Sequence, residues 1–410
     1  MRILIVASFI PYPPDSGARI RTWEIARRFQ REHEVTFGLH VRSQSDLARV
    51  EAIRRHGFQV IAGSVNRGWR ALVTGLFEIL SGGPPLFALR RSRDLEIELA
   101  RAHAAEPFDV IQIEHFELAR YGRFIGTTDG AVRSMILHDV LSLAYARMAS
   151  IERNPFWRIW RRYNSNRLKI YERRLLPAYS ICITVSDNDC AQITGFVEPK
   201  RIHVLPNGVD TTAKTLLVEP GPDVPAILFV GLFLYPPNAD AARWMLEEIF
   251  PRVRALLPEC SLYLVGGDAP RDLIKLSRSP GVFLTGRVDD VTPYYARCQV
   301  AVAPLRAGGG TRLKILEAMA FGRPVVSTTL GAEGLPVKDG EHLLLADTAG
   351  DFARSTVELL QDPLRRSRLR KNARIFVERG YRWEDCAAAH LRLYETLSAN
   401  RRSLTPKESR

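Results

Sequence analysis

The sequence predicts an α/β protein built from two doubly wound parallel sheets. Short apolar runs alternate with amphipathic helices in both halves of the 410-residue chain, and the alternation restarts after a turn-rich stretch at 206–210. A chain of this length exceeds one typical domain. Apolar runs that alternate with helices are typical of buried parallel strands. Ligands of such sheets bind outside the carboxyl ends of the strands, so we expect a site in a cleft between two facing domains.

In the first half, the first helix is expected at 19–31, directly after Pro13-Pro14-Asp15-Ser16-Gly17. Ser186 and Asp189 form a capping-box pattern, which indicates a helix start and not a nucleophile. Residues 67–93 contain an amphipathic helix that could be core, a membrane-dipping segment or an acceptor lid, and the sequence leaves these open. The expected strands are 3–8, 35–39, 60–62, 110–113, 134–137 and 181–185.

The second half repeats this alternation after the turn at 206–210. We expect one domain at 1–205 and a second at 206–380. A C-terminal helix should follow at 381–398, and then a mobile tail at 399–410. The expected strands are 226–230, 261–265, 282–285, 300–304 and 324–327.

The composition is that of an ordinary globular protein, with 46% hydrophobic and 25% charged residues. Five scattered cysteines without a C-x-x-C pair argue for a reducing compartment and against a disulfide frame or zinc site. No apolar run approaches the roughly 20 residues of a membrane-spanning helix. The apolar N-terminus passes directly into prolines, so it is interpreted as a first strand and not as a signal peptide. We therefore expect a cytoplasmic protein.

The formal net charge of +13 is densest at 153–174, where eight basic residues stand against one acid, Glu172. Aromatic residues interleave with them at roughly helical spacing. A basic helix with an aromatic face is typical of a segment on an anionic membrane surface, here the inner face of the plasma membrane. An ordinary helix whose aromatics are core is the open alternative. Nucleic acid is not expected as a partner, because no recognition motif is present.

The most informative segment is 302–328, VAPLRAGGGTRLKILEAMAFGRPVVST, in which an apolar strand runs into three glycines and a helix. Such a loop lets backbone N–H groups approach an anion, and the helix dipole favours negative charge there. Arg312 and Lys314 add cations, and Glu317 shares a helix face with Lys314. Solvated charges on an ordinary strand–loop–helix are the alternative. An apolar stripe fixes the helix on a sheet, so a nucleotide-sugar site is the better interpretation.

Polar residues also follow two strands of the first half. His138 and Asp139 come after one strand, and Glu114 and His115 end the preceding strand. A lone histidine is often structural, but the carboxyl end of a parallel strand is where a ligand contact is expected. We therefore expect His138, Glu114, His115 and Asp139 to be candidates for ligand contact.

The chain resembles the retaining nucleotide-sugar glycosyltransferases of glycosyltransferase family 4, which have the GT-B fold of two Rossmann-like domains. The GGGTRLKILEAMA form and Pro236-Pro237-Asn238 look like sugar transferases of bacterial polysaccharide clusters. The resemblance covers most of the chain. It includes the glycine loop at Gly17, Thr184-Val185-Ser186, 206–210, Phe229-Val230-Gly231, 264–267, Gly286-Arg287-Val288, 316–320, 322–326 and Tyr381-Arg382-Trp383-Glu384.

The resemblance implies roles for these positions. Glu317 matches the second Glu of the family's Glu-x7-Glu element, which contacts the ribose, and Val288 sits where the family's strand-end loop meets the base. Gly17 matches the loop that closes over the diphosphate, and His138 matches a histidine facing the donor sugar. The resemblance also implies that the domain at 1–205 binds the acceptor, with Glu114, His115 and Asp139 as candidate contacts, and that the domain at 206–380 binds the donor. The implied catalytic residues are His138, Lys314 and Glu317. The implied donor-binding residues are Gly17, Gly231, Val288, Gly309, Gly310, Thr311, Arg312, Leu313, Lys314 and Glu317.

Two positions depart from the family pattern. Gly309 stands where the family has its first Glu, which normally contacts sugar hydroxyls. The family's Val-Gly strand is usually followed by an Arg and a Lys that bind the diphosphate, and 232–236 contains neither. We hypothesise that Arg312 and Lys314 supply that charge from the other side of the site.

The resemblance implies retaining transfer of a sugar, UDP- or GDP-linked, to a lipid-linked saccharide or polysaccharide in bacterial cell-surface or exopolysaccharide synthesis. No cofactor and no metal are expected. One alternative is a sugar-nucleotide epimerase of GT-B fold, which would release no nucleoside diphosphate in step with a glycosylated acceptor. Another is a non-catalytic protein that binds sugar nucleotides at a membrane surface.

Overall fold

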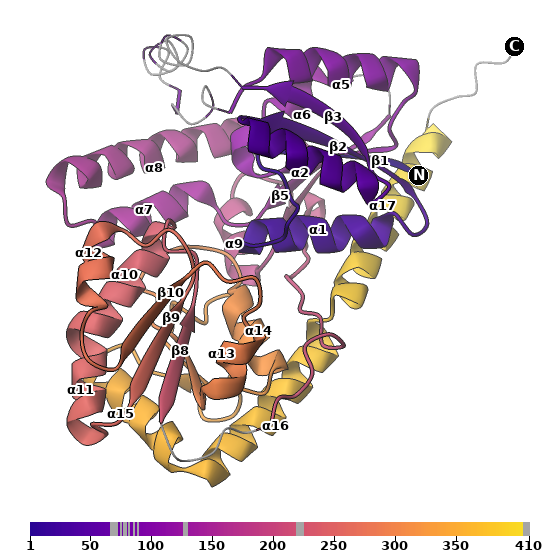
Figure 1. Ribbon diagram of the computed structural model, residues 1–410. Coiled ribbons are helices and arrows are strands. Elements are labelled where there is room, and N and C mark those ends of the chain that lie inside the picture. Colours follow the sequence, from indigo (N-terminus) through magenta and orange to yellow (C-terminus); the bar gives the residue numbers. More distant parts are fainter. Residues whose placement is uncertain are drawn as a thin grey trace, which may run out of the picture. The chain divides into compact units, whose positions relative to one another are not determined.

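The protein folds into two compact units, each with one parallel sheet, in a computed structural model (Figure 1). The structure describes residues 1–404 except 66–72, 74–75, 77–79, 81–82, 85–86, 88–89, 126–129 and 219–224. Unit 1 comprises Met1–Tyr145, Trp160–Pro206 and Trp383–Arg410, and unit 2 comprises Ala146–Ile159 and Asn207–Arg382. Two Rossmann-like α/β units confirm the predicted fold class. Much of the helix expected at 67–93 lies outside the described residues.

The sheet of unit 1 has seven parallel strands in the order β3-β2-β1-β4-β5-β6-β7. The strand order reverses between β1 and β4, so the carboxyl ends of β1, β4 and β5 lie at the edge where ligands of such sheets bind. Glu114 is the last residue of β4. The six predicted strands are present, and β7 is additional. The bounds are β1 Arg2–Ala7, β2 Glu34–Val41, β3 Gln59–Ser64, β4 Val110–Glu114, β5 Val132–Leu137, β6 Ile181–Thr184 and β7 Ile202–Val204.

Serine side chains cap three of the helices of unit 1, namely α2, α5 and α9. Ser186 caps α9 by accepting from the Asp189 backbone N–H at 3.1 Å, so the predicted capping role is confirmed. The bounds are α1 Gly17–Phe29, α2 Gln44–Arg55, α5 Arg93–Ala105, α6 Tyr121–Phe124, α7 Leu141–Ile151, α8 Pro155–Leu175 and α9 Asp187–Ile193, with short 3-10 turns at Phe116–Leu118, Leu176–Ala178 and Pro199–Arg201.

The C-terminal helix α17, Trp383–Leu404, completes the core of unit 1. The Tyr394 hydroxyl donates to Gln112 at 2.8 Å and to Ser134 at 3.0 Å, and these residues lie on β4 and β5. Arg28 of α1 pairs with Glu384 at 2.6 Å. The helix continues past 398, so the tail expected from 399 is still helical at first, and 405–410 lie outside the described residues.

The sheet of unit 2 has six parallel strands in the order β10-β9-β8-β11-β12-β13, and its order reverses between β8 and β11. The carboxyl ends of these two strands therefore form the expected ligand edge. The five predicted strands are present, and the two-residue β13 is additional. The bounds are β8 Ala226–Val230, β9 Ser261–Val265, β10 Val282–Gly286, β11 Val300–Ala303, β12 Val325–Ser327 and β13 Leu344–Leu345.

Helices cover both faces of this sheet. In Figure 1, α10, α11 and α12 lie on one side of β8, β9 and β10, and α13 and α14 lie on the other. The bounds are α10 Pro236–Trp244, α11 Phe250–Leu256, α12 Arg271–Leu276, α13 Thr292–Arg297, α14 Leu313–Ala320, α15 Ala349–Gln361 and α16 Pro363–Gly380, with a π-helical turn at Met245–Ile249 joining α10 to α11.

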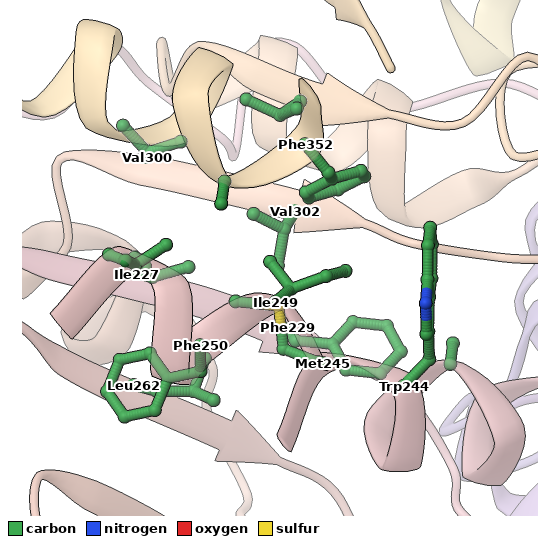
Figure 2. Packing of buried hydrophobic residues seen from close by; sticks show 14 of the residues in the cluster. Ile227, Phe229, Trp244, Met245, Ile249, Phe250, Leu262, Val300, Val302 and Phe352 are labelled. Carbon is green, nitrogen blue, oxygen red and sulfur yellow. The ribbon is translucent and has the colours of Figure 1, made fainter. Parts of the chain in front are cut away.

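A dense aromatic and aliphatic cluster holds β8 in place. Figure 2 shows Phe229 of β8 among Trp244, Met245 and Phe352, and the rings of Trp244 and Phe352 meet edge to face at 5.9 Å. Burial of such side chains contributes about 1.5–3 kcal/mol each. This packing holds the carboxyl end of β8 in place, and with it Gly231, which directly follows the strand. Within the described part of the chain, no helix combines the length and apolar character that crossing a membrane requires.

Candidate functional site

The glycine loop of unit 2 joins β11 to α14 at the ligand edge of the sheet. Gly308 has φ of 108° and Gly310 has φ of 68°, values that favour glycine. A Cβ on Gly308 would lie 3.1 Å from both Arg312 Nη2 and the Tyr235 hydroxyl. The loop therefore needs glycine for its backbone and for this close approach. The structure shows the strand, loop and helix that the sequence predicts here.

Lys314 reaches from α14 to the end of β8. Its Nζ donates to Asn238 Oδ1 at 2.8 Å and lies 4.4 Å from the centre of the Phe229 ring. A Cβ on Gly231 would come within 3.0 Å of Nζ, so Gly231 leaves room for this amine. Burial, with a smaller contribution from the Arg312 charge, lowers the pKa of Lys314 to about 7. The side chain places a cation beside the segment 232–236, which has none of its own.

Glu317 lies one turn further along α14 and is paired with a lysine that the sequence reasoning missed. Lys214 Nζ lies 2.7 Å from Glu317 Oε1, and the Tyr295 hydroxyl donates to the other oxygen at 3.3 Å. Hydrogen bonds from Thr292, with a further contribution from the Lys214 charge, lower the pKa of Asp290. The loop after β10 also contains the partly buried Val288. A lysine about 100 residues upstream of the motif carries no local sequence signal.

Arg312 is the residue before α14, and its side chain is turned under the glycine loop. The residue is 8% exposed, and Nη1 donates to the Gly309 carbonyl. Arg147, on the part of α7 that belongs to unit 2, donates to the Gly308 carbonyl at 2.9 Å and pairs with Glu333 at 2.7 Å. Two arginines thus hold successive carbonyls of the loop, and Arg147 was not predicted from the sequence.

In unit 1, the strand-end residues His138 and Glu114 form a close pair. His138 Nε2 and Glu114 Oε2 are 2.5 Å apart, and Gln112 donates to Glu114 Oε1 at 2.5 Å. Glu114 is 1% exposed. Burial alone would raise the pKa of Glu114, but the His138 hydrogen bond and nearby positive charge outweigh it and lower this pKa to about 2.

His115 stacks on His138, with ring centroids 4.2 Å apart and planes 14° apart. Burial, with a further contribution from His138, lowers the pKa of His115 to about 4, so this ring is neutral at pH 7. Phe9 meets its other side edge-on at 5.1 Å. The sequence reasoning offered Glu114 as an acceptor contact. In the structure it is buried, and its two oxygens are hydrogen-bonded to His138 and Gln112.

The remaining predicted positions lie at the same strand ends. Asp139 is partly exposed directly after His138, and Gly17 is the exposed first residue of α1 in unit 1. Gly231 follows β8, and its N–H donates to the Val265 carbonyl at 2.9 Å. Among the residues that the structure describes, no group of three or more His, Cys, Asp or Glu side chains is placed to hold a metal ion.

Two family models match the chain, one on each half. Residues 16–213 match the model "Glycosyltransferase Family 4", and residues 224–362 match the model "Glycosyl transferases group 1". The second match spans β8, the glycine loop and α14. The matches agree with the family resemblance drawn from the motifs.

Relatives of known sequence include a protein of the cps region of Klebsiella pneumoniae, described as an uncharacterized 44.6 kDa protein. It is 23% identical over 399 residues, which cover 93% of this chain and 96% of that protein. The phosphatidyl-myo-inositol mannosyltransferase of Mycolicibacterium smegmatis is 30% identical over 203 residues, covering 47% of this chain and 52% of that enzyme.

Solved structures share the fold at low sequence identity. Anabaena Alr3699/HepE, in complex with UDP and glucose, has a TM-score of 0.69 at 17% identity and covers 97% of this chain and 99% of its own. Sucrose-phosphate synthase from Thermosynechococcus elongatus has a TM-score of 0.74 at 18% identity, covering 98% of this chain and 100% of its own. The two halves of the chain thus match a Glycosyltransferase Family 4 model and a Glycosyl transferases group 1 model, and the solved structures share its fold of two Rossmann-like sheets.

Proposed function

We propose that this protein is a glycosyltransferase that moves a sugar from a nucleotide-sugar donor to a lipid-linked saccharide or polysaccharide, with retention of anomeric configuration, in bacterial cell-surface polysaccharide synthesis. The observation that carries the proposal is Lys314, whose amine lies at the end of β8 beside the glycine loop and one turn from Glu317. The relative in a cps region supports the process, and the UDP bound to the Anabaena structure favours UDP over GDP in the donor.

In the proposed complex, the diphosphate binds the backbone N–H groups of 310–313 and the Lys314 amine. The N–H groups and the amine stabilise the negative charge that develops on the leaving diphosphate. Stabilisation of charge that develops in the transition state is the most effective electrostatic contribution to the rate. The ribose hydroxyls bind the pair of Glu317 and Lys214, which offers an acceptor and a donor side by side. The base lies against Val288. Because cations and a helix N-terminus take the leaving-group charge, the proposal needs no metal ion.

His138 is proposed to contact the donor sugar, with Glu114 as its positioning residue. In the reaction, the bond between the anomeric carbon and the diphosphate oxygen breaks, and the acceptor oxygen forms the new bond as its proton leaves. No protein nucleophile takes part. The main contribution of the protein is to hold donor and acceptor in reacting geometry.

A transfer assay tests this function. Purified protein with a UDP- or GDP-sugar and a polyprenyl-diphosphate saccharide should release nucleoside diphosphate in equal amount to the glycosylated product. Proton NMR of the product should show the anomeric configuration of the donor, and EDTA should leave the rate unchanged. An epimerase would instead change the sugar nucleotide without releasing nucleoside diphosphate, and a binding protein would bind the nucleotide without turnover.

Donor affinity should fall as pH rises above about 7. The protonated Lys314 attracts the diphosphate, and its pKa of about 7 means that it loses its proton as pH increases through that value. Because bound diphosphate raises this pKa, affinity should weaken by up to about tenfold per pH unit above 7 and level off below it. A nucleotide sugar serves as the probe, because it has no phosphate monoester that titrates here. Calorimetry from about pH 6 to about pH 9 measures the effect, and a flat profile would refute it.

We further propose that the basic helix α8 contacts an anionic membrane surface. Three apolar side chains at its start are exposed, namely Phe156 (67%), Trp157 (50%) and Ile159 (69%). These three side chains therefore lie outside the core. Apolar side chains that accompany basic ones are what interfacial binding requires.

Replacing Arg161, Arg162 and Lys169 with Glu should weaken binding to phosphatidylglycerol vesicles by about tenfold or more, since each basic residue near such a surface contributes about 1 kcal/mol. Vesicle sedimentation measures this. A variant with Lys338, Arg368 and Lys371 changed to Glu carries the same charge change on exposed positions of unit 2 and should bind as the unaltered protein does. Equal loss in both variants would mean that only net charge matters.

A further inference from the structure

Arg312 has hydrogen-bond donors that nothing else in the described structure satisfies. Its Nε and Nη2 are buried and have no partner among the residues described, whereas Nη1 donates to the Gly309 carbonyl. The residue is 8% exposed. Buried polar groups are nearly always hydrogen-bonded, and an unpaired charged one is costly. A guanidinium held in this way calls for an anionic partner.

One of the two unpartnered nitrogens, Nη2, lies against the glycine loop. Nη2 comes within 3.1 Å of where a Cβ on Gly308 would be, on the same side as the Tyr235 hydroxyl. Lys314, in contrast, is directed to Asn238 and Gly231. The two cations of this segment therefore have different neighbours: Lys314 lies at the end of β8, and Arg312 lies against the glycine loop.

The residue at position 309 indicates which kind of ligand could bind the unpartnered donors of Arg312. The family's glutamate at this position contacts the sugar, and a carboxylate there would repel a negatively charged sugar. In this chain the position is glycine, and the Arg312 guanidinium is bonded to its carbonyl. Compared with the family pattern, this loop lacks a carboxylate at 309 and has a guanidinium bonded to the carbonyl of that residue. Guanidinium forks bind carboxylates through two parallel hydrogen bonds.

We propose that the donor sugar is a uronic acid, whose carboxylate binds Nε and Nη2 of Arg312. The inference rests on the proposed function, because it names the class of sugar taken by the same donor site. Reaching the buried nitrogens requires a shift of the 308–310 loop, which its glycines permit. The carboxylate then satisfies donors that the protein leaves unpaired, and a neutral sugar with a hydroxymethyl group cannot do so.

Calorimetric titration of the purified full chain with matched ligands tests this. The probes are UDP, UDP-glucose and UDP-glucuronate, together with GDP, GDP-mannose and GDP-mannuronate. Within the base series that binds, the uronate should bind at least about tenfold more tightly than its neutral counterpart, as expected for a bidentate charged pair. Equal binding of the two overturns this inference while leaving the nucleotide site standing. No binding by any of the six overturns the proposed function itself.

Two variants locate the preference. Arg312→Gln should remove the advantage of the uronate over the neutral sugar, because the charged fork is lost. Gly309→Glu, at a glycine whose φ is not positive, should reverse the preference toward the neutral sugar. Arg306→Gln is the matched control: it removes an arginine of the same loop whose guanidinium already pairs with Asp240 at 2.7 Å, and the preference should persist.

The variants also show which anionic group of the donor Arg312 binds, the diphosphate or the sugar carboxylate. If Arg312→Gln weakens UDP, UDP-glucose and UDP-glucuronate equally, Arg312 binds the diphosphate and the inference is wrong. Because Nη1 holds the Gly309 carbonyl, Arg312→Lys is measured as well. It keeps the charge without the fork and should retain only part of the preference. Circular dichroism melting of each variant shows whether the fold is intact.

Discussion

Lys314→Ala should lower the rate of sugar transfer about 10²- to 10³-fold, the cost typical of losing one group that stabilises charge in a transition state. The amine is partly buried over the Phe229 ring, where water screens its charge weakly. No cation from the segment 232–236 can replace it. Affinity for the nucleoside diphosphate should also fall, by about tenfold or more, since the ground-state diphosphate already carries charge.

Steady-state kinetics and calorimetry on the same preparation separate the two effects. A larger loss in kcat than in affinity would indicate that Lys314 acts mainly as the leaving group departs. Lys338→Ala is the control, because Lys338 is exposed and pairs only with Glu341 among the described residues. Unchanged nucleotide affinity in Lys314→Ala would refute the assignment of this lysine to the diphosphate.

The substitution should leave the fold intact. The Lys314 amine makes one hydrogen bond, to Asn238, which also donates to the Leu232 carbonyl at 2.9 Å. Removing a partly buried lysine of lowered pKa relieves a desolvation cost, and the lost hydrogen bond is worth about 1 kcal/mol. The midpoint temperature of thermal unfolding should therefore change by a few degrees at most. A collapse of stability would make the kinetic result uninformative, and Lys314→Met, which keeps the apolar stem, would then replace it.

The sequence predicted the parts of the fold that have a local cause. Buried apolar runs identified eleven of the parallel strands, and Ser186 identified the start of α9. The strands missed, β7 and β13, are three and two residues long, too short for an apolar run to distinguish them from a turn. The glycine loop and α14 were predictable because glycines, cations and an apolar stripe coincide within about 15 residues.

The contacts that tune the site could not be predicted, because they join residues far apart in the chain. Lys214 meets Glu317 across more than 100 residues, and Arg147 reaches Gly308 across 161. Neither residue stands in a motif. The direction of the Arg312 side chain was equally hidden, since a charge beside an anion site is expected to face the anion. Only the packed structure shows that it turns under the loop.

The second large effect is expected at the pair of His138 and Glu114. His138→Ala should lower transfer about 10²-fold while nucleoside diphosphate affinity stays unchanged, because this histidine is proposed to contact the sugar and not the nucleotide. Glu114→Gln should lower the rate by about tenfold, since it removes the charged hydrogen bond that orients the ring. Nucleotide affinity that falls with either substitution would contradict the assignment.

Glu114→Gln should also destabilise unit 1. Measuring this loss of stability makes it possible to distinguish it from the effect of Glu114 on the orientation of His138. Arg21 is 1% exposed and donates to the Leu205 and Pro206 carbonyls, and burial lowers its pKa while the charge of Glu114 opposes that shift. Removing the carboxylate charge leaves Arg21 less compensated, at a cost of about 2–4 kcal/mol in the free energy of unfolding. Urea unfolding measures this.

The double variant decides whether Glu114 acts through His138. If it does, His138→Ala with Glu114→Gln should be no slower than His138→Ala alone, because the carboxylate has nothing left to orient. Glu117→Gln is the matched control, three residues along, where the carboxylate binds Ser8 at 2.9 Å and Arg90 at 3.3 Å. It should show additive rate effects with His138→Ala. Full additivity for Glu114→Gln as well would mean that Glu114 acts through stability alone, and His138 would then owe its orientation to its stacking on His115.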